Sequence, residues 1–157
     1  NIEADVFFAG ALVEEVRSHQ KAQRPVLQVG IVDEGVRLKV ERERLVSVLC
    51  HLVQNAQEAT EDDGKVEMCL HSKGDFVVIS IEDSGCGMDE EFVRTRLFKP
   101  FDTTKGSAGM GIGVYEAQQF VQSNGGNLDV VSQVGKGTVF HVCLPVYKRD
   151  DGVEEVR

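Results

Sequence analysis

The chain has 157 residues, 41% of them hydrophobic, and a formal net charge of −9 at pH 7. This length fits one compact domain with a single core, and no apolar run approaches the ~18 residues that a membrane-spanning helix needs. No cluster of Lys and Arg is present to neutralise phosphates. We therefore expect no nucleic-acid partner and no direct membrane contact.

The first half of the chain is predicted to alternate helices with pairs of strands. Apolar residues spaced near a period of 3.6 indicate helices, and alternating residues bounded by Gly, Asp or Pro indicate strands. In chain order the predicted elements are a helix over 5–20, strands over 26–32 and 36–40 around the turn 33–35, a helix over 42–60, and a hairpin of strands over 65–72 and 76–82.

The second half opens with a glycine-rich stretch at 83–88. The elements predicted after it are a short helix near 89–96, a polar loop over 98–109, a helix over 110–124, and strands over 127–133 and 137–145. Because the strands arrive as hairpins separated by helices, we predict an α/β sandwich (α+β). Its sheet would be mixed and mostly antiparallel, with helices packed on one face.

The four cysteines show no metal-binding or disulfide pattern. No two of them have a CxxC spacing, and Cys50, Cys69 and Cys143 lie in apolar stretches, where a free thiol acts as a small core residue. Such usage is typical of the reducing cytoplasm. Because the chain starts at Asn1 and not at Met, we expect a fragment of a longer protein, monomeric by itself.

Two glycine-containing segments predict contacts with a ligand. Asp83 ends an apolar strand beside Gly85 and Gly87, so the backbone can approach a planar ligand while the carboxylate accepts from an amine. The glycines of 109–113 expose successive amides at a helix N-terminus, which suits phosphate, although the spacing is neither Walker nor dinucleotide. The alternatives are a turn capped by Asp and a flexible linker.

Two polar segments predict further contacts. His51, Asn55 and Glu58 share one face of the helix over 42–60, so we expect their side chains to point to one place. An amide oxygen and a carboxylate suit Mg²⁺. The segment 98–105 sets two Phe around a Pro and ends in two Thr and a Lys, which predicts an anchored loop that reaches phosphate. The alternatives are a solvated helix face and an ordinary surface loop.

The order of these segments resembles the ATP-binding catalytic domain of sensor histidine kinases, in the superfamily of gyrase, Hsp90, histidine kinases and MutL. The match covers about residues 10–145 in the family's order. The resembling segments are 51–59 (the N box), 83–88 (the first glycine box), 97–101 (the F box), 109–113 (the second glycine box) and 137–140 (the GTxF element).

The resemblance implies a Bergerat-type fold that binds ATP and Mg²⁺. Asp83 would bind the adenine amine with help from Thr138. Asn55 would ligate Mg²⁺, with Glu58 as a further candidate, and 98–109 would form a lid. The implied catalytic residues are His51, Asn55 and Lys105. The implied nucleotide contacts are Asn55, Glu58, Asp83, Gly85, Gly87, Met88, Phe98, Phe101, Thr103, Thr104, Lys105, Gly109, Met110, Gly111, Ile112, Gly113 and Thr138.

The activity that the resemblance implies is transfer of the γ-phosphate of ATP to a histidine on a separate dimerisation/phosphoacceptor domain of the same kinase, and onward to a response regulator. None of the chain's own histidines has the helical context of that acceptor. Residues 1–20 would be the end of a dimerisation helix or a linker, 21–147 the catalytic domain, and 148–157 a charged, disordered tail. The location would be cytoplasmic, as in the cytoplasmic portion of a membrane-bound sensor.

Three alternatives stay open. Hydrolysing members of the superfamily resemble one another in a Glu four residues before the metal-binding Asn, and here that position is His51, which disfavours a mechanical ATPase. A serine kinase of the anti-sigma type is disfavoured by the two Phe of the F box. A non-enzymatic nucleotide-binding relay module would share every motif.

Overall fold

The computed structural model describes residues 4–99 and 110–148. Within these ranges no helix is long and apolar enough to cross a membrane. The elements in chain order are β1 (Asp5–Phe8), α1 (Gly10–His19), β2 (Leu27–Val32), β3 (Arg37–Val40), α2 (Arg42–Glu58), β4 (Val66–Lys73), β5 (Phe76–Asp83), α3 (Glu90–Thr95), α4 (Met110–Ser123), β6 (Asn127–Gln133) and β7 (Gly137–Pro145).

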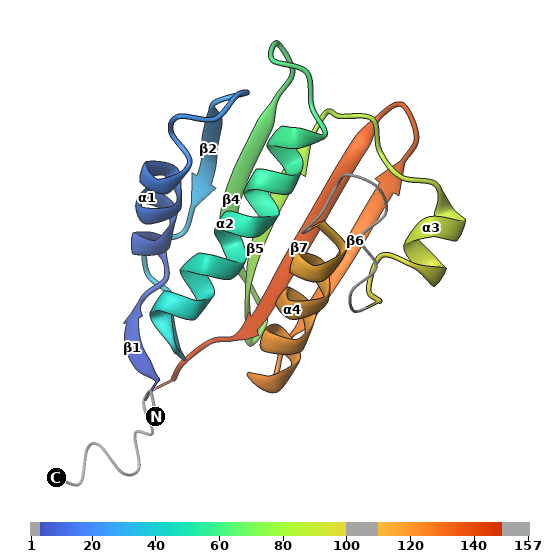
Figure 1. Cartoon of the computed structure of the whole chain (residues 1–157). Coiled ribbons are helices and arrows are strands. Elements are labelled where there is room, and N and C mark those ends of the chain that lie inside the picture. Colours follow the sequence, from blue (N-terminus) through green and yellow to red (C-terminus); the bar gives the residue numbers. More distant parts are fainter. Residues whose placement is uncertain (1–3, 100–109, 149–157) are drawn as a thin grey trace, which may run out of the picture.

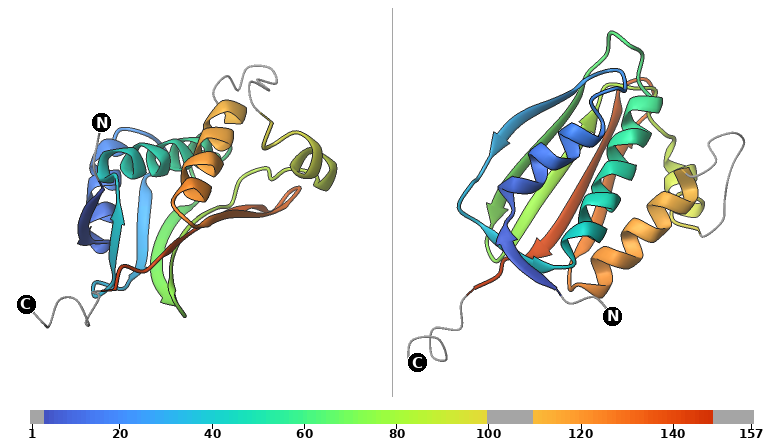
Figure 2. Two further views of the ribbon diagram at one scale, coloured as in Figure 1. Left: turned by 90° about the horizontal axis from the view of Figure 1, so that it is seen from below. Right: turned by 60° about the vertical axis from the view of Figure 1, so that its left-hand side comes forward.

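Five strands form one sheet in the order β2-β4-β5-β7-β6, and β1 pairs with β3 in a separate two-stranded sheet. Every neighbouring pair in the large sheet is antiparallel except β2 and β4, which run parallel. Helices α1, α2 and α4 lie on one face of the large sheet, and α3 lies beyond its β6 side (Figures 1 and 2). The predicted sandwich with a mixed, mostly antiparallel sheet is confirmed.

The core fills the space between these helices and the sheet. The apolar stripe of α2 supplies Leu45, Leu49 and Leu52, each with no exposed surface. From the sheet side, alternate residues of β5 such as Ile79 and Ile81 face the same interior at 1% exposure. This alternation leaves the opposite face of β5 and β7 to carry the more exposed side chains.

The beginning of the chain differs from the prediction. The helix predicted over 5–20 begins only at Gly10, because residues 5–8 form β1 and pair with β3. Leu12 and Val16 of α1 are fully buried against the same core as α2. Whether residues 1–20 continue a dimerisation helix stays a prediction, but residues 5–19 pack onto this domain.

The hairpin expected around the turn 33–35 is wrong. An Asp33 carboxylate accepts from Gly35 N at 2.9 Å and shapes the turn, yet the two flanking strands separate after it. Strand β2 pairs in parallel with β4, while β3 pairs with β1. The connection from β2 to β4 therefore passes through β3 and α2, as parallel pairing requires a crossover and cannot use a tight turn.

Candidate functional site

A cavity of about 380 Å³ lies between α2, the loop after β5, α3, the second turn of α4, and β7. Five residues singled out from the sequence line it together: Asn55, Asp83, Gly87, Met88 and Thr138. They come from three segments that are distant in the chain. The fold thus assembles the cavity from the N box, the first glycine box and the GTxF element.

Asp83 forms the polar end of this cavity. It is the last residue of β5 and is 6% exposed. Its Oδ1 accepts from Gly85 N at 2.8 Å and from Thr138 N at 3.3 Å, whereas its Oδ2 accepts from none of the described residues. Burial raises the pKa of this carboxyl, the two backbone N–H donors oppose the rise, and the charge of Glu82 adds to it. Asp83 therefore offers one oriented acceptor oxygen to a ligand.

The glycines of the loop are required by the protein's own packing. A Cβ at Gly85 would lie 2.2 Å from the carbonyl oxygen of Ala59 at the end of α2. Gly87 has a φ of +72°, and its Cβ would lie 2.1 Å from the carbonyl oxygen of Gln133. Both distances are far below van der Waals contact. The loop is therefore wedged between the end of α2 and the β6–β7 hairpin, a reason that the sequence pattern did not reveal.

Two hydrogen bonds between backbone groups hold this loop in place. Cys86 N donates to the carbonyl oxygen of Ala59 at 3.1 Å, and Gly135 N in the β6–β7 turn donates to the carbonyl oxygen of Cys86 at 2.8 Å. Ser132 adds a third tie, because its Oγ accepts from Met88 N at 2.8 Å. These three hydrogen bonds therefore attach the loop both to the end of α2 and to the β6–β7 hairpin.

Asn55 is the residue best placed for a metal. It lines the cavity from α2, its Nδ2 is buried, and its side-chain amide makes no hydrogen bond to the described residues. An unengaged amide whose oxygen is available fits a Mg²⁺ that keeps several waters and binds phosphates. The described residues contain no group of three or more His, Cys, Asp or Glu that could hold a metal.

His51 and Glu58 do not join Asn55 at the cavity, so the expected convergence of the three side chains is wrong. His51 lines a separate groove between α2 and α4, where it lies 3.8 Å from the position of a Cβ at Gly113. Glu58 is exposed and accepts from Gln54 Nε2 at 3.2 Å. Different segments of the protein pack along the length of one helix face, so side chains on that face need not reach the same cavity.

The segments that are predicted to bind phosphate are described only in part. Helix α4 begins at Met110, so the amides of 110–113 form its first turn, and Val114 in the next turn lines the cavity. First-turn amides lack partners within the helix and suit an anion. Phe98 is half-buried and packs against the core without lining the cavity. The predicted contacts that lie outside the described residues are Phe101, Thr103, Thr104, Lys105 and Gly109.

An apolar wall of the cavity was missed by the sequence reasoning. It consists of Phe92 and Leu97 around α3, Val114 on α4, and Phe140 on β7. Phe140 could have been found, because it lies two residues after Thr138 and so shares its face of the strand. Arg96 reaches the same wall, with its guanidinium 5.8 Å from the centre of the Phe92 ring. A flat apolar ligand such as a purine base fits between such surfaces.

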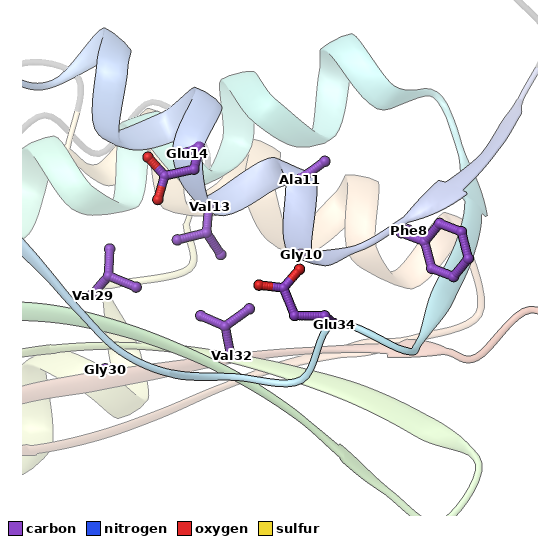
Figure 3. A pocket seen from close by; sticks show the side chains of 9 residues that line it. All are labelled: Phe8, Gly10, Ala11, Val13, Glu14, Val29, Gly30, Val32 and Glu34. Atoms are coloured by element: carbon purple, nitrogen blue, oxygen red, sulfur yellow. The ribbon is translucent and has the colours of Figure 1, made fainter.

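A larger cavity of about 670 Å³ lies elsewhere, between β1, α1 and β2. Glu14 and Glu34 bring two carboxylates to it, beside Val13, Val29 and Val32 (Figure 3). None of the residues singled out for chemistry lines this cavity, and its two carboxylates would repel a phosphate. We therefore place the functional site at the smaller cavity.

Comparison with known proteins agrees with this geometry. Residues 40–148, more than half of the chain, match the family described as histidine kinase-, DNA gyrase B- and HSP90-like ATPases. The chain belongs to this family. Its match begins at the last residue of β3 and includes every segment that contributes to the smaller cavity.

Among curated relatives, the chain is similar to sporulation kinase E of Bacillus subtilis strain 168, with 35% identity over 121 residues. That match covers 76% of this chain but 16% of the relative, so the chain spans less than a fifth of that protein. Among solved structures, the catalytic domain of histidine kinase ThkA has 28% identity and a TM-score of 0.78, covering 92% of this chain and 96% of that domain. ThkA in complex with the response regulator protein TrrA matches with 25% identity and a TM-score of 0.76, covering 92% of this chain and 42% of that one.

Proposed function

We propose that this chain is the ATP-binding catalytic domain of a two-component sensor histidine kinase. It binds Mg-ATP and donates the γ-phosphate to a histidine on a separate dimerisation/phosphoacceptor domain. The observation that carries the proposal is the pairing, in one cavity, of the free Oδ2 of buried Asp83 with the unengaged amide of Asn55. The names of sporulation kinase E and of histidine kinase ThkA support the same activity.

The base of ATP occupies the end of the cavity nearest the sheet. Asp83 Oδ2 accepts from the exocyclic amine, and the apolar wall of Phe92, Leu97 and Phe140 holds the ring. A hydrogen bond to a charged acceptor contributes about 1.5–3 kcal/mol. This contact therefore accounts for roughly a ten- to hundredfold preference for a base that carries the amine.

The phosphates extend from the base toward Asn55 and the first turn of α4. Asn55 would hold Mg²⁺ through its amide oxygen, and the metal would supply charge neutralisation for the transferring phosphoryl group. The amides of 110–113 bind phosphate oxygens, and Lys105 contributes a point charge. His51 flanks the groove between α2 and α4 and is a polar neighbour of the γ-phosphate, while Glu58 takes no direct part.

The nucleophile comes from outside the chain. The acceptor imidazole and any base that orients it belong to the dimerisation domain, so this domain binds and orients ATP and presents the γ-phosphate. We place the parent kinase's catalytic part in the cytoplasm, with a response regulator as the onward acceptor. The complex of ThkA with TrrA supports such a partner. Turnover of ATP by the chain alone is expected to be slow.

Calorimetric titration with ATP, with and without Mg²⁺, tests the site. Asp83→Asn keeps an Oδ1 for its two backbone donors but loses the charged acceptor, so affinity falls about ten- to hundredfold. Asn55→Ala binds ATP without a Mg²⁺ dependence. The matched controls are Asp129→Asn on exposed β6 and Gln54→Ala beside Asn55, and both keep wild-type binding. A folded wild-type chain that ignores millimolar ATP would refute the proposal.

The transfer step is tested in the parent kinase. With radiolabelled ATP, the intact protein gains an alkali-stable, acid-labile phosphate, as a phosphohistidine requires, and Asp83→Asn abolishes the labelling. Acid-stable labelling would instead indicate a serine kinase. Binding of ATP with no labelling of any acceptor would indicate a relay module.

A further inference from the structure

We propose that the groove between α1 and β2 is a docking surface for an extended, positively charged segment of the parent protein that lies outside this chain. The groove is the cavity of about 670 Å³, and no residue lines both it and the nucleotide cavity. The inference therefore goes beyond the proposed function, and a segment in the groove and ATP in its cavity can be bound together.

Strand β2 lies at one end of the five-stranded sheet and has a free outer edge. It pairs with β4 on one side, and no strand within residues 4–99 and 110–148 pairs with it on the other side. Helix α1 lies on one face of the sheet and not along this edge (Figures 1 and 2). An edge strand presents unpaired backbone groups, which an extended segment can reach.

The groove beside this edge has an apolar floor and an apolar rim. Val13 of α1 is 2% exposed, and Val29 and Val32 of β2 are half-buried next to it (Figure 3). Phe8 of β1 lines the groove with a side chain that is 55% exposed, and Ile31, between two lining residues of β2, is 76% exposed. Large apolar side chains that gather in this way mark interaction surfaces.

A β-bulge accounts for the exposure of Ile31. Val29 is the partner of Met68 and Val32 is the partner of Leu70, so an advance of three residues on β2 matches an advance of two on β4. A bulge turns a side chain to a new direction and interrupts continuous pairing along an edge. Strand β2 is therefore poorly suited to pair along its whole length with β2 of a second copy.

The charges at the groove select a cationic occupant. Glu14 and Glu34 line it, and no Lys or Arg does. Glu34 is exposed and makes no hydrogen bond or ion pair with the described residues, whereas Glu14 has only an exposed pair with Arg17 at 3.4 Å. A second copy would bring its own carboxylates and a net charge of −9 to the same place. A Lys or Arg next to an aliphatic side chain fits instead.

The occupant belongs to the same polypeptide. A groove that holds only a few side chains binds a free segment weakly, but a tether within one protein supplies an effective concentration in the millimolar range. The chain spans less than a fifth of sporulation kinase E, so a relative of this kind has ample length from which such a segment can come.

The test puts the photocrosslinking residue p-benzoylphenylalanine in place of Ile31 in the parent protein, and mass spectrometry identifies the crosslinked peptides. The expected product is a crosslink within one polypeptide, to a segment outside this chain in which a Lys or Arg is next to an aliphatic residue. The matched control has the same photocrosslinker in place of Val131, which is 64% exposed on the opposite edge strand β6, and it does not reach that segment.

Charge variants test what selects the segment. Glu14→Gln combined with Glu34→Gln is expected to lower the crosslink yield about 3- to 10-fold, the effect of losing two exposed ion pairs. Asp62→Asn combined with Asp63→Asn removes the same net charge from an exposed turn away from the groove and keeps the wild-type yield. Both double variants keep wild-type binding of ATP, which shows that the fold is intact.

A crosslink between two copies, or to a segment without a basic residue, would overturn the inference. So would a yield that the Gln variants leave unchanged, and so would the absence of any crosslink from position 31 in a parent protein that binds ATP. A parent protein that does not bind ATP contradicts the proposed function instead, and the crosslink at the groove is read separately from that result.

Discussion

Thr138 stands directly opposite Asp83 across β7 and β5, and its backbone N–H donates to Asp83 Oδ1 over 3.3 Å. Together with the bond from Gly85 N, this contact holds the carboxylate in one orientation before any ligand arrives. The orientation reduces the ordering that binding would otherwise require. The orientation of the Asp83 carboxylate is thus set in part by the sheet itself.

The binding of ATP is expected to weaken as the pH falls into the acidic range. Burial raises the pKa of Asp83, so this carboxyl takes up its proton at a higher pH than an ordinary Asp. As the pH falls through that pKa, Oδ2 changes from an acceptor into an O–H donor that opposes the adenine amine. Calorimetric affinities measured at a series of pH values give the midpoint of this loss.

The exposed residue Glu82 provides the control for this pH dependence. Its negative charge contributes to the raised pKa of Asp83, so Glu82→Gln lowers that pKa and moves the loss of affinity to lower pH. The phosphates of ATP titrate alike in both proteins and cancel in the comparison. Identical midpoints for the two proteins would show that Asp83 is not the group responsible.

Substitution of the loop glycines should affect both stability and binding. In Gly85→Ala the new Cβ would meet the carbonyl oxygen of Ala59 at 2.2 Å, so the loop or the end of α2 must shift. Overpacking of this kind costs about 1–3 kcal/mol in the free energy of unfolding. Urea denaturation measures the cost, and Gly35→Ala is the control, because its Cβ would have only an ordinary contact at 3.5 Å.

Substitution of Phe92 should mainly lower the affinity for ATP, whereas substitution of Leu97 should mainly lower the stability of the fold. Helix α3 is capped by Asp89, whose carboxylate accepts from Phe92 N at 2.8 Å, and it buries none of its residues fully. Phe92→Ala therefore weakens ATP binding with little change in unfolding. Leu97 is 1% exposed, so Leu97→Ala lowers the free energy of unfolding by about 2–5 kcal/mol. Equal loss of stability in both variants would contradict this assignment of roles.

Nucleotide should raise the melting temperature of the chain, because four distant segments meet only in the folded site. At a free Mg-ATP concentration about 100-fold above Kd the stabilisation is about 2.7 kcal/mol, which for this length raises Tm by about 5–10 °C. Differential scanning fluorimetry measures the shift. Asp129→Asn keeps it and Asp83→Asn loses most of it, whereas a shift that persists in Asp83→Asn would place the nucleotide elsewhere.

Local patterns predicted most of the elements. The hairpin of β4 and β5 and that of β6 and β7 were placed within a residue or two, because alternation and a glycine turn are properties of neighbouring residues. The apolar stripe of α2 likewise predicted both its extent and its buried face. The order of motifs then indicated which segments would meet, and the cavity brings together those that contain Asn55, Asp83 and Thr138.

Non-local partners could not be predicted in the same way. Alternation marks residues 26–32 as a strand but does not say that it pairs in parallel with β4 instead of with β3. Helical spacing puts His51 and Asn55 on one face of α2. In the structure, however, His51 lies in the groove between α2 and α4, whereas Asn55 lines the cavity. The glycines of the loop were predicted to leave room for a ligand. In the structure, the absence of a side chain at Gly85 and Gly87 instead leaves room for the carbonyl oxygens of Ala59 and Gln133.

The tie between Gly135 N and the carbonyl oxygen of Cys86 makes the length of one surface turn part of the site. A residue inserted into the β6–β7 turn would carry Gly135 away from this carbonyl and Gln133 away from Gly87. Hairpin turns ordinarily accept insertions, tags and new termini, because their backbone groups bond to water. Here the turn is a fixed-length spacer, and lengthening it changes the shape of the cavity from a distance.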